Sequence, residues 1–238
     1  MKNISFPFLF FFFTLLSCSK STSFLEKREE MVKRHVERRG ITSPLILNAF
    51  RNIPREKFVL PQYQDRAYQD LELPIGEGQT LDLPYEDAVI IHALDLKPTD
   101  KVLEVGTGAG YLAALMGHIA KEVYTIEIRP GLANTARQRL QELGYQNVFV
   151  LTGDGYKGWP EHAPFDAIVL TASPDYVPEP LVEQLREGGR LVLPLGGEKK
   201  FQELVLYTKE NRKLKLLKRL SGAQFVPMEG IIQEQEKK

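Results

Sequence analysis

Residues 101–127 read KVLEVGTGAGYLAALMGHIAKEVYTIE, and this stretch decides the expected fold. An apolar run over Val102–Val105 ends in glycines that alternate from Gly106, and an apolar segment with helical spacing follows. A second apolar run, Val123–Ile126, is followed directly by Glu127. This layout is typical of a nucleoside-binding βαβ unit, in which glycines allow a tight turn and an acid about 20 residues on binds the ribose hydroxyls. The stretch therefore predicts a nucleoside ligand.

The glycine spacing favours one class of nucleoside ligand over another. A dinucleotide-binding turn reads G-x-G-x-x-G and surrounds a pyrophosphate with donors. Here Gly106, Gly108 and Gly110 alternate strictly, and Glu104 stands two residues before the first of them. A carboxylate at that point suits a ligand with an ammonium group, and S-adenosylmethionine has one, together with a ribose for Glu127. The motif alone leaves open a purely structural turn, in which Glu104 only caps loop amides.

Composition limits the classes of protein and partner. A chain of 238 residues is long enough for one sizeable domain with an elaboration. Its 31 basic residues balance its 31 acidic ones, so no net charge attracts the chain to nucleic acid, and we expect no nucleic-acid partner. Cys18 is the only cysteine, which excludes disulfides and thiolate metal clusters, and we expect no metal.

The N-terminus has the pattern of a targeting segment. Met1–Leu16 carries one early lysine and then a Phe-rich apolar run that is too short to span a bilayer, as in a secretory signal. The following Leu-Leu-Ser-Cys ending resembles a bacterial lipoprotein cleavage box, in which the cysteine is lipidated. We therefore assign residues 1–22 to a leader and tether and predict membrane attachment through Cys18. The alternative is that translation starts at Met31.

From Lys101 onward strand-like and helix-like patterns alternate, which is typical of parallel strands joined by crossover helices. The expected strands are Val102–Val105, Glu122–Ile126, Val148–Leu151, Ala167–Leu170 and Arg190–Leu195, and the expected helices are Tyr111–Ile119, Pro130–Leu143 and Pro178–Leu185. The segments Glu203–Thr208 and Lys213–Leu220 predict an antiparallel hairpin. The predicted fold class is α/β, a doubly wound and mostly parallel sheet that ends in this hairpin.

The part before Lys101 predicts a helical and loop-rich cap. Helices are expected at Phe24–Arg39, Pro44–Phe50 and Glu86–Leu96, and an ordered loop at Pro54–Pro84. Long loops inside compact domains are often functional. We expect a single domain over residues 23–238, made of a cap (23–98), a cofactor-binding core (99–200) and a C-terminal hairpin and tail (201–238).

Several further motifs carry a resemblance to a known family. They are GDGYKGWP at 153–160, FDAI at 165–168, LVLPLG at 191–196 and LPIG at 73–76. In this order they resemble those of protein-L-isoaspartate O-methyltransferases, from about Glu29 through Met228. The resemblance implies a class I, Rossmann-like methyltransferase that moves the methyl group of S-adenosylmethionine to the carboxylate of an isoaspartyl residue. The ester closes to a succinimide, whose hydrolysis returns part of the damage to aspartyl. Isoaspartyl-containing proteins and peptides are the implied partners, and we expect a monomer.

The resemblance also implies roles for individual residues. The cofactor-binding residues would be Glu104, Gly106, Thr107, Gly108, Glu127, Asp154, Gly155 and Thr171. Asp154, after the third strand, would accept a hydrogen bond from the adenine amino group, although an Asp-Gly turn former is the alternative. Gly78, Gln79 and Thr80 would form the loop that covers the methyl group, with Thr80 at the catalytic end. Residues 225–227 would border the peptide groove.

This chemistry needs few acid–base residues. An isoaspartyl carboxylate has a pKa of about 4 and is ionised at neutral pH, so no general base is required. The protein has to hold the reacting atoms in line and exclude water, and orientation of that kind accounts for roughly 7–11 kcal/mol in favourable cases.

One position departs from the family pattern. The loop usually reads G-[AQ]-T-I-S-x-P, but here residues 78–84 read GQTLDLP, so Asp82 occupies the place of the serine. An ionised Asp82 would repel the incoming carboxylate by about 4 kcal/mol at about 4 Å and an effective dielectric near 20, against about 1 kcal/mol for a hydroxyl hydrogen bond. Our hypothesis is that transfer is weakened unless Asp82 is protonated or turned away. The alternative is that Asp82 caps the helix starting near Pro84.

Two other functions stay open from the sequence. The first is methyl transfer to another carboxylate, or cofactor binding without transfer because of Asp82. The second is a dinucleotide oxidoreductase, which the alternating glycines and Glu104 disfavour. The location is open as well, because the leader indicates export whereas S-adenosylmethionine is made and held in the cytosol.

Overall fold

The computed structural model describes residues 23–196 and 201–235. The predicted leader and the lipidation site at Cys18 lie outside the described residues. Within the described part of the chain, no helix is both long and apolar enough to cross a membrane.

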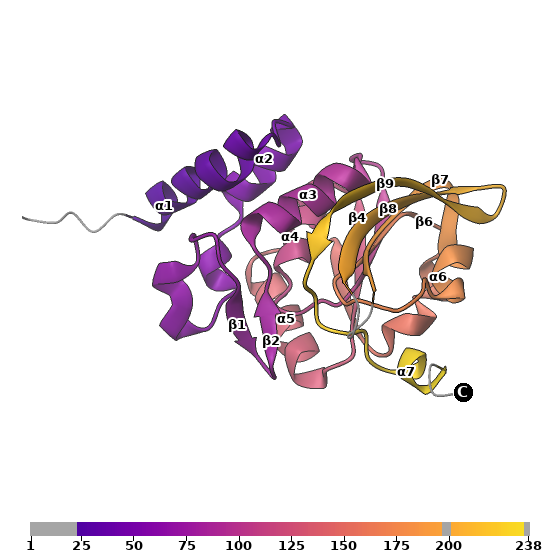
Figure 1. Ribbon diagram of the computed structural model, residues 1–238. Coiled ribbons are helices and arrows are strands. Elements are labelled where there is room, and N and C mark those ends of the chain that lie inside the picture. Colours follow the sequence, from indigo (N-terminus) through magenta and orange to yellow (C-terminus); the bar gives the residue numbers. More distant parts are fainter. Residues whose placement is uncertain (1–22, 197–200, 236–238) are drawn as a thin grey trace, which may run out of the picture.

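A seven-stranded sheet forms the centre of the molecule (Figure 1). In spatial order its strands are β5 (Val148–Thr152), β4 (Glu122–Glu127), β3 (Lys101–Val105), β6 (Phe165–Leu170), β7 (Leu185–Leu195), β8 (Gln202–Glu210) and β9 (Lys213–Ala223). The first five pair in parallel, and β8 and β9 pair antiparallel at one edge. This arrangement confirms the predicted doubly wound sheet and its C-terminal hairpin. All five predicted parallel strands are present, although β7 begins five residues earlier than expected, at Leu185.

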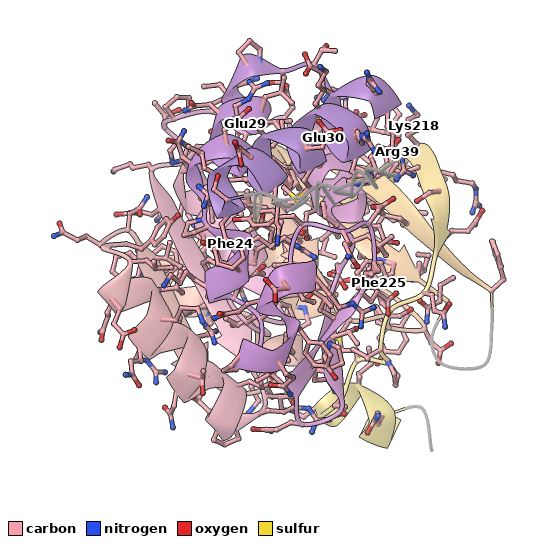
Figure 2. The ribbon with its side chains drawn as sticks, turned by 90° about the vertical axis from the view of Figure 1, so that its left-hand side faces the viewer. Phe24, Glu29, Glu30, Arg39, Lys218 and Phe225 are labelled. Atoms are coloured by element: carbon pink, nitrogen blue, oxygen red, sulfur yellow. The ribbon has the colours of Figure 1, made fainter. Side chains whose placement is uncertain are left out.

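Helices cover the sheet, and two further helices come first in the chain. The α-helices are α1 (Phe24–Met31), α2 (Pro44–Asn52), α3 (Pro84–Leu94), α4 (Tyr111–Gly117), α5 (Pro130–Glu142), α6 (Glu179–Gln184) and α7 (Ile231–Gln235). Short turns of other helix types lie at Val32–Val36, Glu37–Arg39, Arg55–Lys57, Pro61–Arg66, Gly155–Lys157 and Pro160–His162. The helix expected over Phe24–Arg39 is therefore α-helical only in its first half, and it ends at Gly40, whose φ is 100°. Figure 2 shows this N-terminal segment in front of the strands, with Glu29, Glu30 and Arg39 on it.

Alternate residues of the central strands fill two separate cores. Val102 of β3 and Val192 of β7 belong to the core that α2, α3, α4 and α5 cover. Leu103 and Leu191, one residue along each strand, belong to the opposite core, which α6 covers. Such continuous burial on both faces is what a parallel sheet between two helical layers requires. The helices do not cover the carboxyl ends of β3, β4 and β6, and a pocket opens there.

The predicted loop Pro54–Pro84 contains a hairpin that the sequence pattern missed. Strands β1 (Leu73–Gly76) and β2 (Gln79–Leu81) pair antiparallel. Their two-residue turn, Glu77 and Gly78, has φ values of 51° and 75°. Two-residue hairpin turns of this kind need positive φ at both positions, and Asn-Gly or Asp-Gly is the usual signal. Because Glu seldom adopts positive φ, the Glu-Gly pair did not indicate a hairpin turn in the sequence.

Candidate active site

A pocket of about 330 Å³ opens at the carboxyl ends of β3, β4 and β6. Strand β3 lies between β4 and β6, so the pocket occupies the point where the direction of strand order reverses, the usual ligand position in open α/β sheets. Of the residues predicted to form the site, the pocket is lined by Thr80, Asp82, Glu104, Gly106, Thr107, Gly108, Glu127, Gly155 and Thr171. Asp154 is the one predicted residue that does not line it. Among the described residues, no group of His, Cys, Asp and Glu side chains could hold a metal ion.

The glycine turn is shaped by close approach to β6. Gly106 has a φ of 106°, and a Cβ placed on it would lie 2.2 Å from Oγ1 of Thr171. That hydroxyl donates a hydrogen bond to the carbonyl oxygen of Gly106 at 2.8 Å. Thr171 therefore holds the turn against the end of β6, and only glycine satisfies both the conformation and the space at position 106.

Glu104 is fully buried at the end of β3 and has one free acceptor. Its Oε2 accepts a hydrogen bond from the Thr125 hydroxyl at 2.5 Å, whereas Oε1 has no partner. Burial raises the pKa of Glu104 to about 8, the Thr125 hydrogen bond lowers it, and the charges of Asp87 and Glu127 raise it further. Leaving a buried acceptor unpaired costs about 1–3 kcal/mol, and more for a charged group. A cationic ligand group in the pocket would remove this cost, so the residues present fit an ammonium-bearing cofactor.

Glu127 is held by backbone amides at the end of β4. Its Oε2 accepts from the N–H of Gly108 at 2.9 Å, and its Oε1 accepts from the N–H of Arg129 at 3.0 Å. A carboxylate oxygen has two lone pairs, so each oxygen keeps one for a ligand hydroxyl. The side chain is thus held in one orientation by the two amides, with a lone pair left on each oxygen.

Asp154 lies differently from what the resemblance implied. Its Oδ1 accepts from the N–H of Tyr156 at 2.9 Å, and its Oδ2 accepts from the N–H of Ile231 at 2.8 Å. The carboxylate is therefore turned to its own turn and to the C-terminal segment, as a turn-forming Asp-Gly would be. The neighbouring Gly155 does line the pocket, and a Cβ there would lie 2.2 Å from Cγ1 of Val105. The predicted contact between Asp154 and adenine stays a prediction.

Thr80 and Asp82 follow the β1–β2 turn and line the same pocket as Glu104 and Glu127. Thr80 is exposed within β2, and Asp82 is half-buried just beyond it. Burial raises the pKa of the Asp82 carboxyl well above its usual range, and the charges of Asp87, Glu86 and Glu72 raise it further, whereas Arg55 lowers it. The helix-cap alternative is wrong, because the N-cap residue of α3 is Leu83 and not Asp82.

Arg55, Asp87 and Tyr111 support this acidic end, and none of them was predicted. The fully buried Arg55 guanidinium donates to the Ala67 carbonyl at 2.9 Å and to the Asp82 carbonyl at 2.5 Å, and lies 3.4 Å from Oδ2 of Asp87. Its guanidinium carbon lies 4.9 Å from the centre of the Tyr111 ring. Burial raises the pKa of Asp87 to about 7, and the Arg55 charge opposes that rise. Arg55 lies in the predicted loop, where no periodicity indicated burial.

The C-terminal segment closes one side of the pocket. Phe225, Val226 and Pro227, which were predicted to border a peptide groove, line this pocket, and Figure 2 shows Phe225 on the stretch that follows the last strand. Beyond them, Glu229 pairs with Arg129 at 2.5 Å, and both line the pocket. The ion pair thus ties the segment to Arg129, the second residue after the end of β4.

Comparisons with known proteins agree with this geometry. A family model described as protein-L-isoaspartate(D-aspartate) O-methyltransferase matches residues 26–233. The protein-L-isoaspartate O-methyltransferase 2 of Shewanella sediminis is 46% identical over 215 residues, which cover 90% of this chain and 88% of that protein. The protein-L-isoaspartate O-methyltransferase of a Picosynechococcus strain is 46% identical over 203 residues, covering 85% and 90% of the two chains.

Solved structures show the same relationship. A protein-L-isoaspartate O-methyltransferase structure superposes with a TM-score of 0.80 at 29% identity, covering 88% of this chain and 69% of that one. A Plasmodium falciparum protein assigned the same methyltransferase name, in complex with S-adenosyl-L-homocysteine, gives a TM-score of 0.73 at 26% identity, covering 85% and 98% of the two chains. Because the family model and these relatives span most of the sequence, the chain belongs to the protein-L-isoaspartate(D-aspartate) O-methyltransferase family.

Proposed function

We propose that this protein transfers the methyl group of S-adenosylmethionine to the free carboxylate of L-isoaspartyl residues in damaged proteins, which initiates their repair. The observation that carries the proposal is a single pocket that joins the unpaired acceptor of Glu104 to the loop that holds Thr80 and Asp82. The family membership and the names of relatives at 46% identity support the same activity.

The carboxylates on the glycine-turn side would hold the cofactor. Oε1 of Glu104 would accept from its ammonium group, and the second lone pairs of Glu127 would accept from its ribose hydroxyls. A related structure contains S-adenosyl-L-homocysteine, the product form of this cofactor. When bound, S-adenosylmethionine supplies both the methyl group and the leaving group of the transfer.

The contribution of the protein to the reaction would be orientation and exclusion of water. The acceptor carboxylate is ionised at neutral pH, so no residue has to remove a proton from it. The β1–β2 hairpin and the segment Phe225–Pro227 line the pocket from two sides and would fix the acceptor peptide between them. Thr80, exposed at the pocket rim, would contact that peptide.

Asp82 would act in its protonated form. Burial and the neighbouring acids raise its pKa, which favours the neutral carboxyl. A neutral carboxyl has an O–H donor and can donate to the incoming carboxylate, as the hydroxyl of a serine would, whereas an ionised one repels it. The departure of this loop from the family pattern is then compatible with activity.

The proposal also covers membrane attachment and oligomeric state. We propose that the chain is a monomer anchored to a membrane through lipidated Cys18. Labelling with palmitate tests the anchor, and a signal that survives Cys18→Ser would contradict it. Light scattering of the chain from Ser23 onward tests the monomer, and a mass of twice the chain would contradict it.

The activity is tested with a matched pair of peptides, one with an isoaspartyl residue and one with an aspartyl residue at the same position. Labelled S-adenosylmethionine and the chain from Ser23 onward should give transfer to the isoaspartyl peptide alone. Glu104→Gln serves as the control, because it removes the carboxylate proposed to bind the cofactor and should abolish the signal. Transfer to both peptides, or cofactor binding without transfer to either, would contradict the proposed substrate.

A further inference from the structure

Two buried threonine hydroxyls connect Glu104 to the glycine turn. Thr125 lies within β4, beside Glu104 in the strand register, and none of its surface is exposed. Its Oγ1 lies 2.5 Å from Oε2 of Glu104 and 2.6 Å from Oγ1 of Thr107, a nearly buried residue of the turn. The three groups form a continuous chain from the turn to the carboxylate.

The direction of these hydrogen bonds follows from the number of protons. A threonine hydroxyl has one hydrogen to donate, and an ionised carboxylate can only accept. With Glu104 ionised, Thr125 donates to Oε2, and its oxygen must then accept the hydrogen of Thr107. Hydrogen bonds in such chains strengthen one another, and a bond to a charged acceptor is roughly twice as strong as a neutral one.

We propose that Thr125 is a positioning residue for cofactor binding, which holds Oε2 of Glu104 so that Oε1 is presented to the ammonium group of the cofactor. The inference rests on the cofactor named in the proposed function but not on its methyl acceptor. Thr125 makes no contact with the pocket, since it is absent from the pocket lining, so it would act only through Glu104.

The hydrogen bond from Thr125 helps to keep Glu104 ionised against the charges around it. Burial disfavours the ionised form of Glu104, and so do the charges of Asp87 of α3 and Glu127 of β4. The hydrogen bond from Thr125 is the influence that opposes them. Arg55, the buried cation of this region, is engaged with Asp87. Without the Thr125 hydroxyl, Glu104 would bind the ammonium group only at higher pH.

The test compares two ligands on three proteins. S-adenosylhomocysteine carries the amino acid end with its ammonium group, whereas 5′-methylthioadenosine is the same nucleoside thioether without that end. Binding is measured by calorimetry for the wild type, Thr125→Val and Thr125→Ser. Thr125→Val should weaken S-adenosylhomocysteine binding at pH 7 by about tenfold to a hundredfold, the range for a hydrogen bond to a charged group. Binding of 5′-methylthioadenosine should be unchanged, which also shows that the variant is folded.

The conservative variant and a pH series complete the test. Thr125→Ser, which keeps the hydroxyl, should restore S-adenosylhomocysteine binding, and the pH at which affinity levels off should move upward in Thr125→Val alone. Equal loss for both ligands would assign Thr125 to packing and overturn the inference, as would no loss for either or no recovery with serine. Failure of methyl transfer to isoaspartyl peptides would bear on the proposed function and leave these binding results intact.

Discussion

The proposed cofactor side of the pocket (Glu104, Glu127 and the glycine turn) and the proposed acceptor side (Thr80 and Asp82) differ in how their polar groups are held. On the cofactor side, Glu127 accepts two backbone amides, Thr171 donates to the glycine turn and Thr125 donates to Glu104. On the acceptor side, the Asp82 carboxyl has no hydrogen bond within the part of the chain that the structure describes, and acids surround it. The polar groups of the first side are thus held by hydrogen bonds before the ligand arrives, whereas the Asp82 carboxyl of the second is not, and its loop is held by one buried arginine.

Removing that arginine should have the largest effect. Arg55→Met leaves Asp87 buried without its cation and frees the Asp82 carbonyl, and we expect a loss of about 3–5 kcal/mol in the free energy of unfolding, measured with urea. The control is Arg51→Met, whose ion pairs with Glu29 and Glu37 are largely exposed, with an expected loss of about 0–1 kcal/mol.

A double variant separates the two functions of Arg55. Arg55→Met with Asp87→Asn removes the buried charge and should recover part of the lost stability, because an unpaired buried charge is the costly species. Equal losses for Arg55→Met and Arg51→Met would show that the acceptor side does not depend on the buried pair.

The glycine turn is the second target, on the cofactor side. Gly106→Ala combines an unfavourable positive φ with overlap onto Thr171, and we expect a loss of about 2–4 kcal/mol in stability together with weakened S-adenosylhomocysteine binding. Gly40 is a matched control, since its φ is 100° and nothing lies within 4 Å of an added Cβ. Gly40→Ala should cost only about 1–2 kcal/mol. If the two variants lose the same stability, the close approach to Thr171 is unimportant.

Glu104 gives an effect that depends on pH. Its pKa is about 8 in the folded protein against an ordinary 4.5, so the folded chain holds a proton that the unfolded chain has lost between these values. Stability without cofactor should therefore fall as pH rises through this window, by up to about 1.4 kcal/mol per pH unit from this group. Urea unfolding of Glu104→Gln from pH 5 to 8 should show a shallower fall. A slope equal to that of the wild type would mean that Glu104 is not protonated in the free protein.

The sequence predicted the cofactor side better than the acceptor side, for a physical reason. The strand, the alternating glycines and Glu127 form a local pattern, and the pocket brings them together as expected. The contacts of Arg55 with Asp87 and of Asp154 with Ile231 join residues far apart in the chain, and no local periodicity reports them. The β1–β2 hairpin was missed because its strands are short and its turn has an unusual Glu at positive φ.

The most direct test of the difference between the two sides is the pH dependence of methyl transfer to an isoaspartyl peptide at saturating S-adenosylmethionine. The kcat/KM of the wild type should fall by about tenfold or more as pH rises through the raised pKa of Asp82, because the ionised carboxyl repels the acceptor. Asp82→Asn stays neutral, so its profile should remain flat over the same range and exceed that of the wild type at high pH. Profiles of the two proteins that coincide, or a wild-type rate that rises with pH, would contradict a protonated Asp82 at the acceptor side.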